Sequence, residues 1–143
     1  MFHTSKHICE SLEEPNPMTL TAIILLVLAL YIVQLFLQET SRFGFDLWGI
    51  VGNRDNLPEM SVIAGRLDRA KNNMLEALPM FLALALLAQI KGGDTNEAAR
   101  AALVFLIARV VYVPAYVSGI LMLRSLVWLV GVASLIMMAV SLI

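Results

Sequence analysis

The sequence has few charged residues and almost no thiol or imidazole groups. Only 15% of its 143 residues are charged and the formal net charge is -1, so we expect no nucleic-acid partner. A single cysteine, Cys9, excludes an intramolecular disulfide. Cys9, His3 and His7 share the first 17 residues without a fourth ligand nearby, so we expect no metal site. From Met18 onward, any thiol chemistry must come from a bound molecule.

Long hydrophobic runs make up most of the sequence. Apolar residues make up 59% of the chain, and the mean hydropathy is +0.81. Four segments together span 81 residues with only two charged side chains, Glu76 and Arg109: residues 18–38, 73–90, 101–123 and 125–143. An apolar run of about 18 or more residues is typical of a membrane-spanning helix. The sequence therefore predicts an all-α integral membrane protein, a bundle of four transmembrane helices.

The chain divides into a polar tail, residues 1–17, and a membrane domain, residues 18–143. The tail carries acidic residues and prolines where a secretory signal needs an apolar core, and an alternative start at Met18 fits this change of composition. The first helix is apolar on all sides, Ser61 is a candidate N-cap of the second, and Arg124 lies at the junction into the fourth. We expect helices over about 18–38, 62–90, 98–121 and 124–143.

Positive charge is distributed unequally between the two ends of these helices. Four spans place both termini on one side of the membrane. The connections on the opposite side contain Arg42, Arg54, Arg66, Arg69, Lys71 and Arg124, and the terminal side contains Lys6, Lys91 and Arg100. Because positively charged loops stay in the cytoplasm, we expect the 39–65 loop to be cytoplasmic.

Polar side chains form one stripe on each of two predicted helices. At about 100° per residue, the polar residues of each helix fall on a single face. The second helix contributes Arg66, Arg69, Asn73 and Glu76. The third contributes Arg109, Tyr112 and Tyr116.

An ionisable group inside a span costs about 2.5–3.5 kcal/mol on insertion scales, so each needs a partner, a cavity or a function. The two stripes are satisfied most economically by facing each other. Glu76 would then pair with Arg109, and Arg66 and Arg69 would remain for an anion. The alternative is that these groups only hold helices together. The excess of positive charge favours a bound carboxylate or thiolate.

Three strings resemble the MAPEG superfamily, the membrane-associated proteins in eicosanoid and glutathione metabolism. GRLDRAKNNMLEALPMF (65–81) contains the family pattern Arg-x-x-x-Asn-x-x-Glu followed by proline. FLIARVVYVPAYVSG (105–119) is similar to the third helix of the family, and LRSLVWLVG (123–131) resembles its bacterial branch. The residues that carry the pattern are Arg69, Asn73, Glu76, Pro79, Arg109, Tyr112 and Tyr116.

The resemblance implies a homotrimer of four-helix bundles that binds glutathione, as cosubstrate, between subunits near the cytoplasmic face. It assigns Arg69, Asn73 and Glu76 to the charged ends of glutathione. Arg124 is the matching candidate for the arginine that stabilises the thiolate. The remaining expected site residues are Tyr112 and Tyr116, which line the cleft, Arg109, which braces Glu76, and Arg42, which contacts glutathione.

These features lead to one functional hypothesis and two alternatives. We expect a glutathione-dependent transferase or peroxidase, surrounded by membrane lipids in a bacterial inner membrane, that acts on lipophilic electrophiles or lipid hydroperoxides. The first alternative is a non-catalytic lipid-binding or scaffold protein of the same fold. The second is a channel or transporter subunit, which needs a polar stripe across the whole bilayer; here the polar residues stop at mid-helix.

Overall fold

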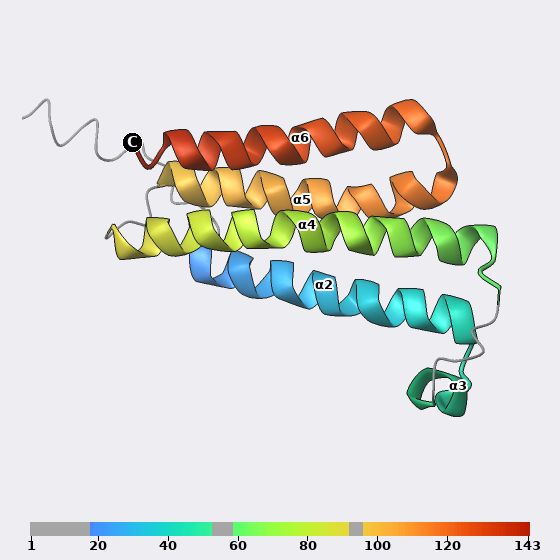
Figure 1. Ribbon diagram of the computed structural model, residues 1–143. Helices are drawn as coiled ribbons and strands as arrows, with labels where there is room; N and C mark the ends of the chain where they lie inside the picture. Colours follow the sequence, from blue (N-terminus) through green and yellow to red (C-terminus); the bar gives the residue numbers. More distant parts are fainter. Residues whose placement is uncertain (1–17, 53–58, 92–95) are drawn as a thin grey trace, which may run out of the picture.

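A computed structural model describes residues 18–52, 59–91 and 96–143 (Figure 1). Within these ranges the chain is helical and contains no strand. The elements are α2 (Leu20–Phe43), α3 (Leu47–Val51), α4 (Val62–Ile90), α5 (Asn96–Ser118) and α6 (Leu121–Val140). The expected tail, 1–17, and Arg54 lie outside the described residues. The four longer helices are each long and apolar enough to cross a membrane, as an integral multi-pass protein requires.

Local signals in the sequence set several helix ends. The Thr19 hydroxyl accepts a hydrogen bond from the Ala22 backbone N–H, and the Ser61 hydroxyl accepts one from Ala64 at 3.1 Å. The predicted N-cap at Ser61 is thereby confirmed. Between α5 and α6, the chain turns at Gly119, whose φ is 78°. The turn comes earlier than predicted, so Arg124 lies in the first turn of α6.

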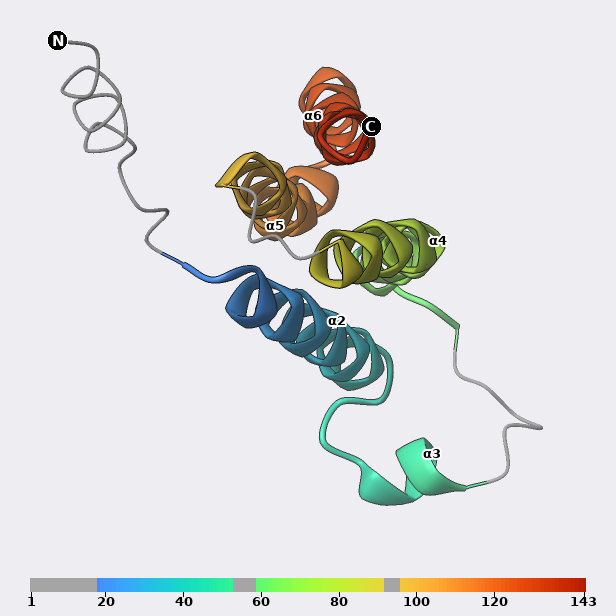
Figure 2. The same cartoon turned by 90° about the vertical axis from the view of Figure 1, so that its left-hand side faces the viewer.

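Consecutive long helices run in opposite directions, so that α2 and α5 run one way and α4 and α6 the other (Figure 1). Seen from the end, α2, α4 and α5 form a triangle, and α6 lies on the side of α5 away from α2 (Figure 2). Helix α6 packs on α5 and α4 and does not contact α2. The start of α4, the end of α5 and the start of α6 therefore meet at one end of the bundle.

Small and aromatic side chains form the core. The Phe81 and Phe105 rings are fully buried and stacked, with centroids 4.6 Å apart. Buried alanines of α4 and α5 let the helix backbones approach closely, as is usual between helices in a bilayer. Large apolar side chains such as Phe36 face outward, where lipid would surround them.

The first span is not apolar on all sides, and that prediction was wrong. Gln34 and Gln38 lie four residues apart on α2 and are both buried. The Gln38 side-chain carbonyl accepts a hydrogen bond from Lys71 at 3.2 Å, and Lys71 also forms an ion pair with Asp68 at 2.8 Å. A spacing of four residues places both glutamines on one helix face, so the high mean hydropathy of the span hid a polar contact with α4.

A buried arginine occupies the place where α4, α5 and α6 meet. Arg109 is only 3% exposed, and its Nη1 donates to the Asn73 Oδ1 at 2.6 Å. Its guanidinium carbon lies 4.9 Å from the Phe105 ring centroid and 5.7 Å from that of Tyr112. On the α6 side the group rests against Gly131, where an added Cβ would lie 3.5 Å from Nη2. Arg109 therefore links three helices at once.

Gly131→Leu should lower the midpoint of thermal unfolding in detergent, because a leucine side chain needs the volume that Arg109 fills. Overpacking of this kind costs about 1–3 kcal/mol. Gly131→Ala is the control: its methyl group makes an ordinary contact at 3.5 Å, and alanine is the better helix former. The alanine variant should unfold at the wild-type temperature or above. An equal loss in both variants would show that contact with Arg109 does not limit this position.

Candidate functional site

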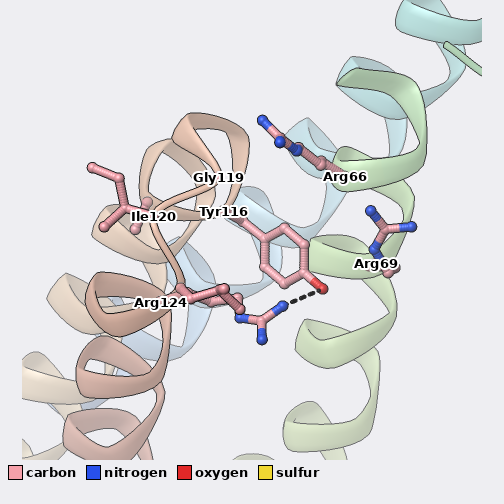
Figure 3. Close-up of a pocket in the computed structure, with 8 residues that line it drawn as sticks. Arg66, Arg69, Tyr116, Gly119, Ile120 and Arg124 are labelled. Carbon is pink, nitrogen blue, oxygen red and sulfur yellow. Dashed lines mark hydrogen bonds between the residues drawn. The ribbon is translucent and has the colours of Figure 1, made fainter. Parts of the chain in front are cut away.

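A cavity of about 170 Å³ opens at the end of the bundle where α4 begins and α5 meets α6 (Figure 3). Three of its walls are arginine side chains, and no acidic side chain is among the described residues that line it. This excess of positive charge suits an anionic ligand. The cavity is lined by Arg66, Arg69, Ala115, Tyr116, Gly119, Ile120, Leu121 and Arg124.

Tyr116 connects two of these arginines. Arg124 Nη1 donates a hydrogen bond to the Tyr116 hydroxyl at 3.2 Å, drawn as a dashed line in Figure 3. The guanidinium carbons of Arg124 and Arg69 lie 5.0 Å and 5.9 Å from the centroid of the Tyr116 ring, within the range of a cation–π contact. Tyr116 therefore helps to keep two like charges beside one cavity.

A second cavity, of about 480 Å³, extends from the first toward the middle of the helices. The two cavities share Tyr116 and Arg124, so Arg124 stands where they meet. The inner cavity has mixed polar and apolar walls: Asn73, Tyr112, Tyr116, Arg124, Ser125, Trp128 and Leu129. An anionic ligand could thus lie in the outer cavity, and an apolar molecule could lie in the inner cavity on the other side of Arg124.

Sequence reasoning missed three residues of the inner cavity, namely Ser125, Trp128 and Leu129. Trp128 follows Arg124 by four residues, so both fall on the same face of α6. That spacing was the available signal. Neither Ser125 nor Leu129 stands out in an apolar span without knowledge of the neighbouring helices.

The polar stripe of α4 divides into two sides. Arg66 and Asn73 face α5: Arg66 Nη1 donates to the Val117 carbonyl at 2.7 Å, and Asn73 accepts from Arg109. Arg69 and Glu76 are exposed on the surface of the single chain. The sequence predicted that Arg66 would remain available for an anion, but in the structure its guanidinium is engaged by the Val117 carbonyl.

The predicted ion pair between Glu76 and Arg109 was wrong for the single chain. In the described part of the chain, no ion pair joins these two side chains, and Arg109 bonds to Asn73 instead. The reason is angular. Asn73 and Glu76 are separated by about 60° around the helix at about 100° per residue, and the side of Asn73 is the one turned toward α5.

The structure brings most of the expected site residues together. Tyr112 and Tyr116 pack edge to face with ring centroids 5.5 Å apart. Arg42 lies in the last turn of α2, with its guanidinium carbon 5.5 Å from the Phe43 ring centroid, and it lines neither cavity. The expected site residues that line one cavity or both are Arg69, Asn73, Tyr112, Tyr116 and Arg124.

Comparison with known proteins gives a match at the level of the family. No curated protein and no solved structure gives a significant match to the sequence. The family model described as MAPEG family matches residues 16–143, which include every helix of the bundle and all residues of both cavities. This integral membrane chain belongs to the MAPEG family.

Proposed function

We propose that the protein is a glutathione-dependent transferase or peroxidase that acts on lipophilic electrophiles or lipid hydroperoxides. One observation carries the proposal: a cavity lined by three arginines meets an inner, partly apolar cavity at Arg124. Glutathione is a thiol with two carboxylates and one ammonium group, and the MAPEG family is associated with it. The outer cavity suits its carboxylates, and the inner one suits an apolar acceptor.

The proposed ligand contacts follow from charge, from available hydrogen-bond donors and from position in the cleft. Arg69 is exposed at the outer cavity and makes no hydrogen bond or ion pair with the described residues, so it is available for a carboxylate. Glu76 is likewise exposed and suits the ammonium group. Asn73 is held by Arg109 through its carbonyl oxygen, which leaves its amide N–H groups as donors. Tyr112 would line the same cleft.

Arg124 would activate the thiol. A free thiol has a pKa of about 8.5, and an adjacent guanidinium lowers it, so that more thiolate is present at neutral pH. In the transferase reaction the sulfur forms a bond to an electrophilic carbon, whose leaving group departs with its electron pair. In the peroxidase reaction two thiols are oxidised to a disulfide, and one hydroperoxide is reduced to an alcohol and water.

The exposure of Glu76 supports an oligomer. It lies near the middle of α4, where an ionisable group facing lipid costs about 2.5–3.5 kcal/mol. A second copy of the chain, packed over this face with glutathione between the subunits, would remove Glu76 from lipid. We propose the homotrimer that the family resemblance implies, with Arg42 contributed to the site of a neighbour.

The distribution of cations supports an orientation in the membrane. The end of the bundle that bears both cavities carries Arg42, Arg66, Arg69, Lys71 and Arg124, whereas Lys91 and Arg100 lie toward the other end. By the positive-inside rule, we propose that the 39–65 loop faces the cytoplasm of a bacterial inner membrane. Glutathione would then enter from the aqueous side, and the lipophilic substrate from the bilayer.

Arg69→Ala and Glu76→Gln should each weaken glutathione binding at least tenfold, or about 1.4 kcal/mol, because each removes a charged partner of the ligand. Calorimetry with the purified protein in detergent measures this change. Arg100→Ala is the matched control, since it removes an exposed arginine of α5 far from both cavities. Unchanged affinity in both site variants would overturn the assignment of Arg69 and Glu76.

Arg124→Ala should leave the affinity for glutathione within about threefold but abolish most of the ultraviolet absorbance of the bound thiolate at neutral pH. Without the guanidinium, a thiol with a pKa of about 8.5 is only about 3% ionised at pH 7. Arg124→Lys, which keeps a positive charge, should retain part of the signal. An undiminished thiolate signal in the alanine variant would remove Arg124 from this role.

The wild-type protein should conjugate glutathione to a chlorodinitrobenzene and release chloride, and it should show no turnover when glutathione is omitted. The assay follows the absorbance of the conjugate and subtracts the reaction in buffer, with Arg124→Ala as the impaired variant. The same preparation is tested for reduction of a lipid hydroperoxide. Tight glutathione binding without turnover of either substrate would favour the non-catalytic lipid-binding or scaffold alternative.

A further inference from the structure

We infer that Arg66 positions the catalytic arginine instead of binding the anion. It lines the same cavity as Arg69 and lies only three residues before it, yet its guanidinium is directed at the turn between α5 and α6 (Figure 3). Arg66 holds this turn, and the turn sets the places of Tyr116 and Arg124. The functional part of this inference rests on the proposed glutathione chemistry, whereas the contact itself does not.

The first observation is a hydrogen bond to the end of a helix. Arg66 Nη1 donates to the Val117 carbonyl at 2.7 Å, and Val117 is the penultimate residue of α5. Carbonyls in the last turn of a helix lack partners within the helix, and they carry the negative end of its dipole. A guanidinium here satisfies the carbonyl and favours the helix end electrostatically. Arg66 thereby links the start of α4 to the end of α5.

The second observation concerns the residue that follows α5. Gly119 has a φ of 78°, which residues with a Cβ rarely adopt. A Cβ at this position would also lie 2.6 Å from Nη2 of Arg66 and 2.8 Å from its Cζ, closer than real Cβ atoms approach. The guanidinium therefore fills the space that a side chain on the turn would need. Glycine at 119 serves both the turn and the close approach of Arg66.

The turn is short enough to transmit this contact to the site. Only Gly119 and Ile120 separate α5 from α6. The Gly119 N–H donates to the Tyr116 carbonyl at 3.2 Å, and the Arg124 N–H donates to the Ile120 carbonyl at 3.2 Å. A shift of the turn would therefore move the two residues whose side chains are joined by the hydrogen bond between Arg124 and Tyr116.

Arg69 provides the matched comparison. It lines the same cavity, but it is exposed and makes no hydrogen bond or ion pair with the described residues. Two arginines of one polar stripe thus have different assignments: Arg69 binds the ligand, and Arg66 holds the turn. Truncation of Arg69 should therefore change the affinity for glutathione, and truncation of Arg66 should change the ionisation of the bound thiol.

The test compares Arg66→Ala, Arg66→Lys and Arg69→Ala in the full chain in detergent. Calorimetry gives the dissociation constant of glutathione, and a pH titration of thiolate absorbance at saturating glutathione gives the midpoint for the bound thiol. Arg66→Ala should raise that midpoint by about one pH unit and change the dissociation constant less than threefold. Arg69→Ala should weaken binding at least tenfold without moving the midpoint.

In Arg66→Lys the titration midpoint should lie close to the wild-type value, because a lysine keeps one donor for the Val117 carbonyl. This rescue also covers the case in which the alanine variant does not fold. Weakened binding in Arg66→Ala with an unmoved midpoint would overturn the inference and make Arg66 a ligand contact. Failure of Arg66→Lys to restore a raised midpoint would overturn it as well.

A double-mutant cycle tests the contact without any ligand. Gly119→Ala strains the backbone in every background, but its clash with the guanidinium exists only when Arg66 is present. It should therefore lower the thermal midpoint more in the wild type than in Arg66→Ala or Arg66→Lys. Equal losses would overturn the contact. If the wild type does not bind glutathione, the proposed function fails while this cycle still decides the role of Arg66 at the turn.

Discussion

The hydrogen bond between Arg109 and Asn73 is the contact on which the arrangement of the site depends. A guanidinium that is 3% exposed inside a membrane bundle needs compensation, and the described structure supplies one short hydrogen bond, two aromatic faces and a glycine surface. These partners come from α4, α5 and α6. Because any rotation of α4 would withdraw Asn73 from Arg109, this bond sets which side of α4 is buried and which is exposed.

The chemistry of the outer cavity follows from that orientation. With Asn73 turned toward α5, Arg66 lies on the same side of α4 about two turns earlier and reaches the end of α5. Arg69 and Glu76 are left on the surface. The charges that hold the fold together are thus separated from those available to a ligand, although both sets lie on a single stripe. A bound anion at Arg69 would not have to compete with the bond between Arg109 and Asn73. The same division leaves Glu76 exposed within a span, and in the proposed homotrimer a neighbouring subunit would cover it.

Much of the fold could be predicted from the sequence, because a near absence of charge over four long segments permits few structures other than membrane helices. The two polar stripes could also be predicted from the helical period. Which members of a stripe face inward could not, since Asn73 and Glu76 differ by only about 60° and the neighbouring helix decides between them. Gln34 and Gln38 were missed because the mean hydropathy of a span averages over all faces of the helix and does not show two polar residues on one of them. The place of the turn depends on the φ of Gly119. The composition of the chain does not indicate that Arg66 packs against this glycine.

The depth of the polar residues bears on which functional class the fold can serve. Asn73 lies about 17 Å along α4 from its start, and beyond it the core is formed by Phe81, Phe105 and buried alanines. A conducting pathway needs polar groups or water across the whole bilayer, whereas here an apolar core follows the level of Arg109 and favours a pocket open at one end. A water-soluble thiol can reach such a pocket from one side, and an apolar partner can reach it from the lipid. The membrane domain has no cysteine of its own. Under the proposed function, the arginines at the mouth of the pocket would therefore hold and ionise a thiol that arrives from solution.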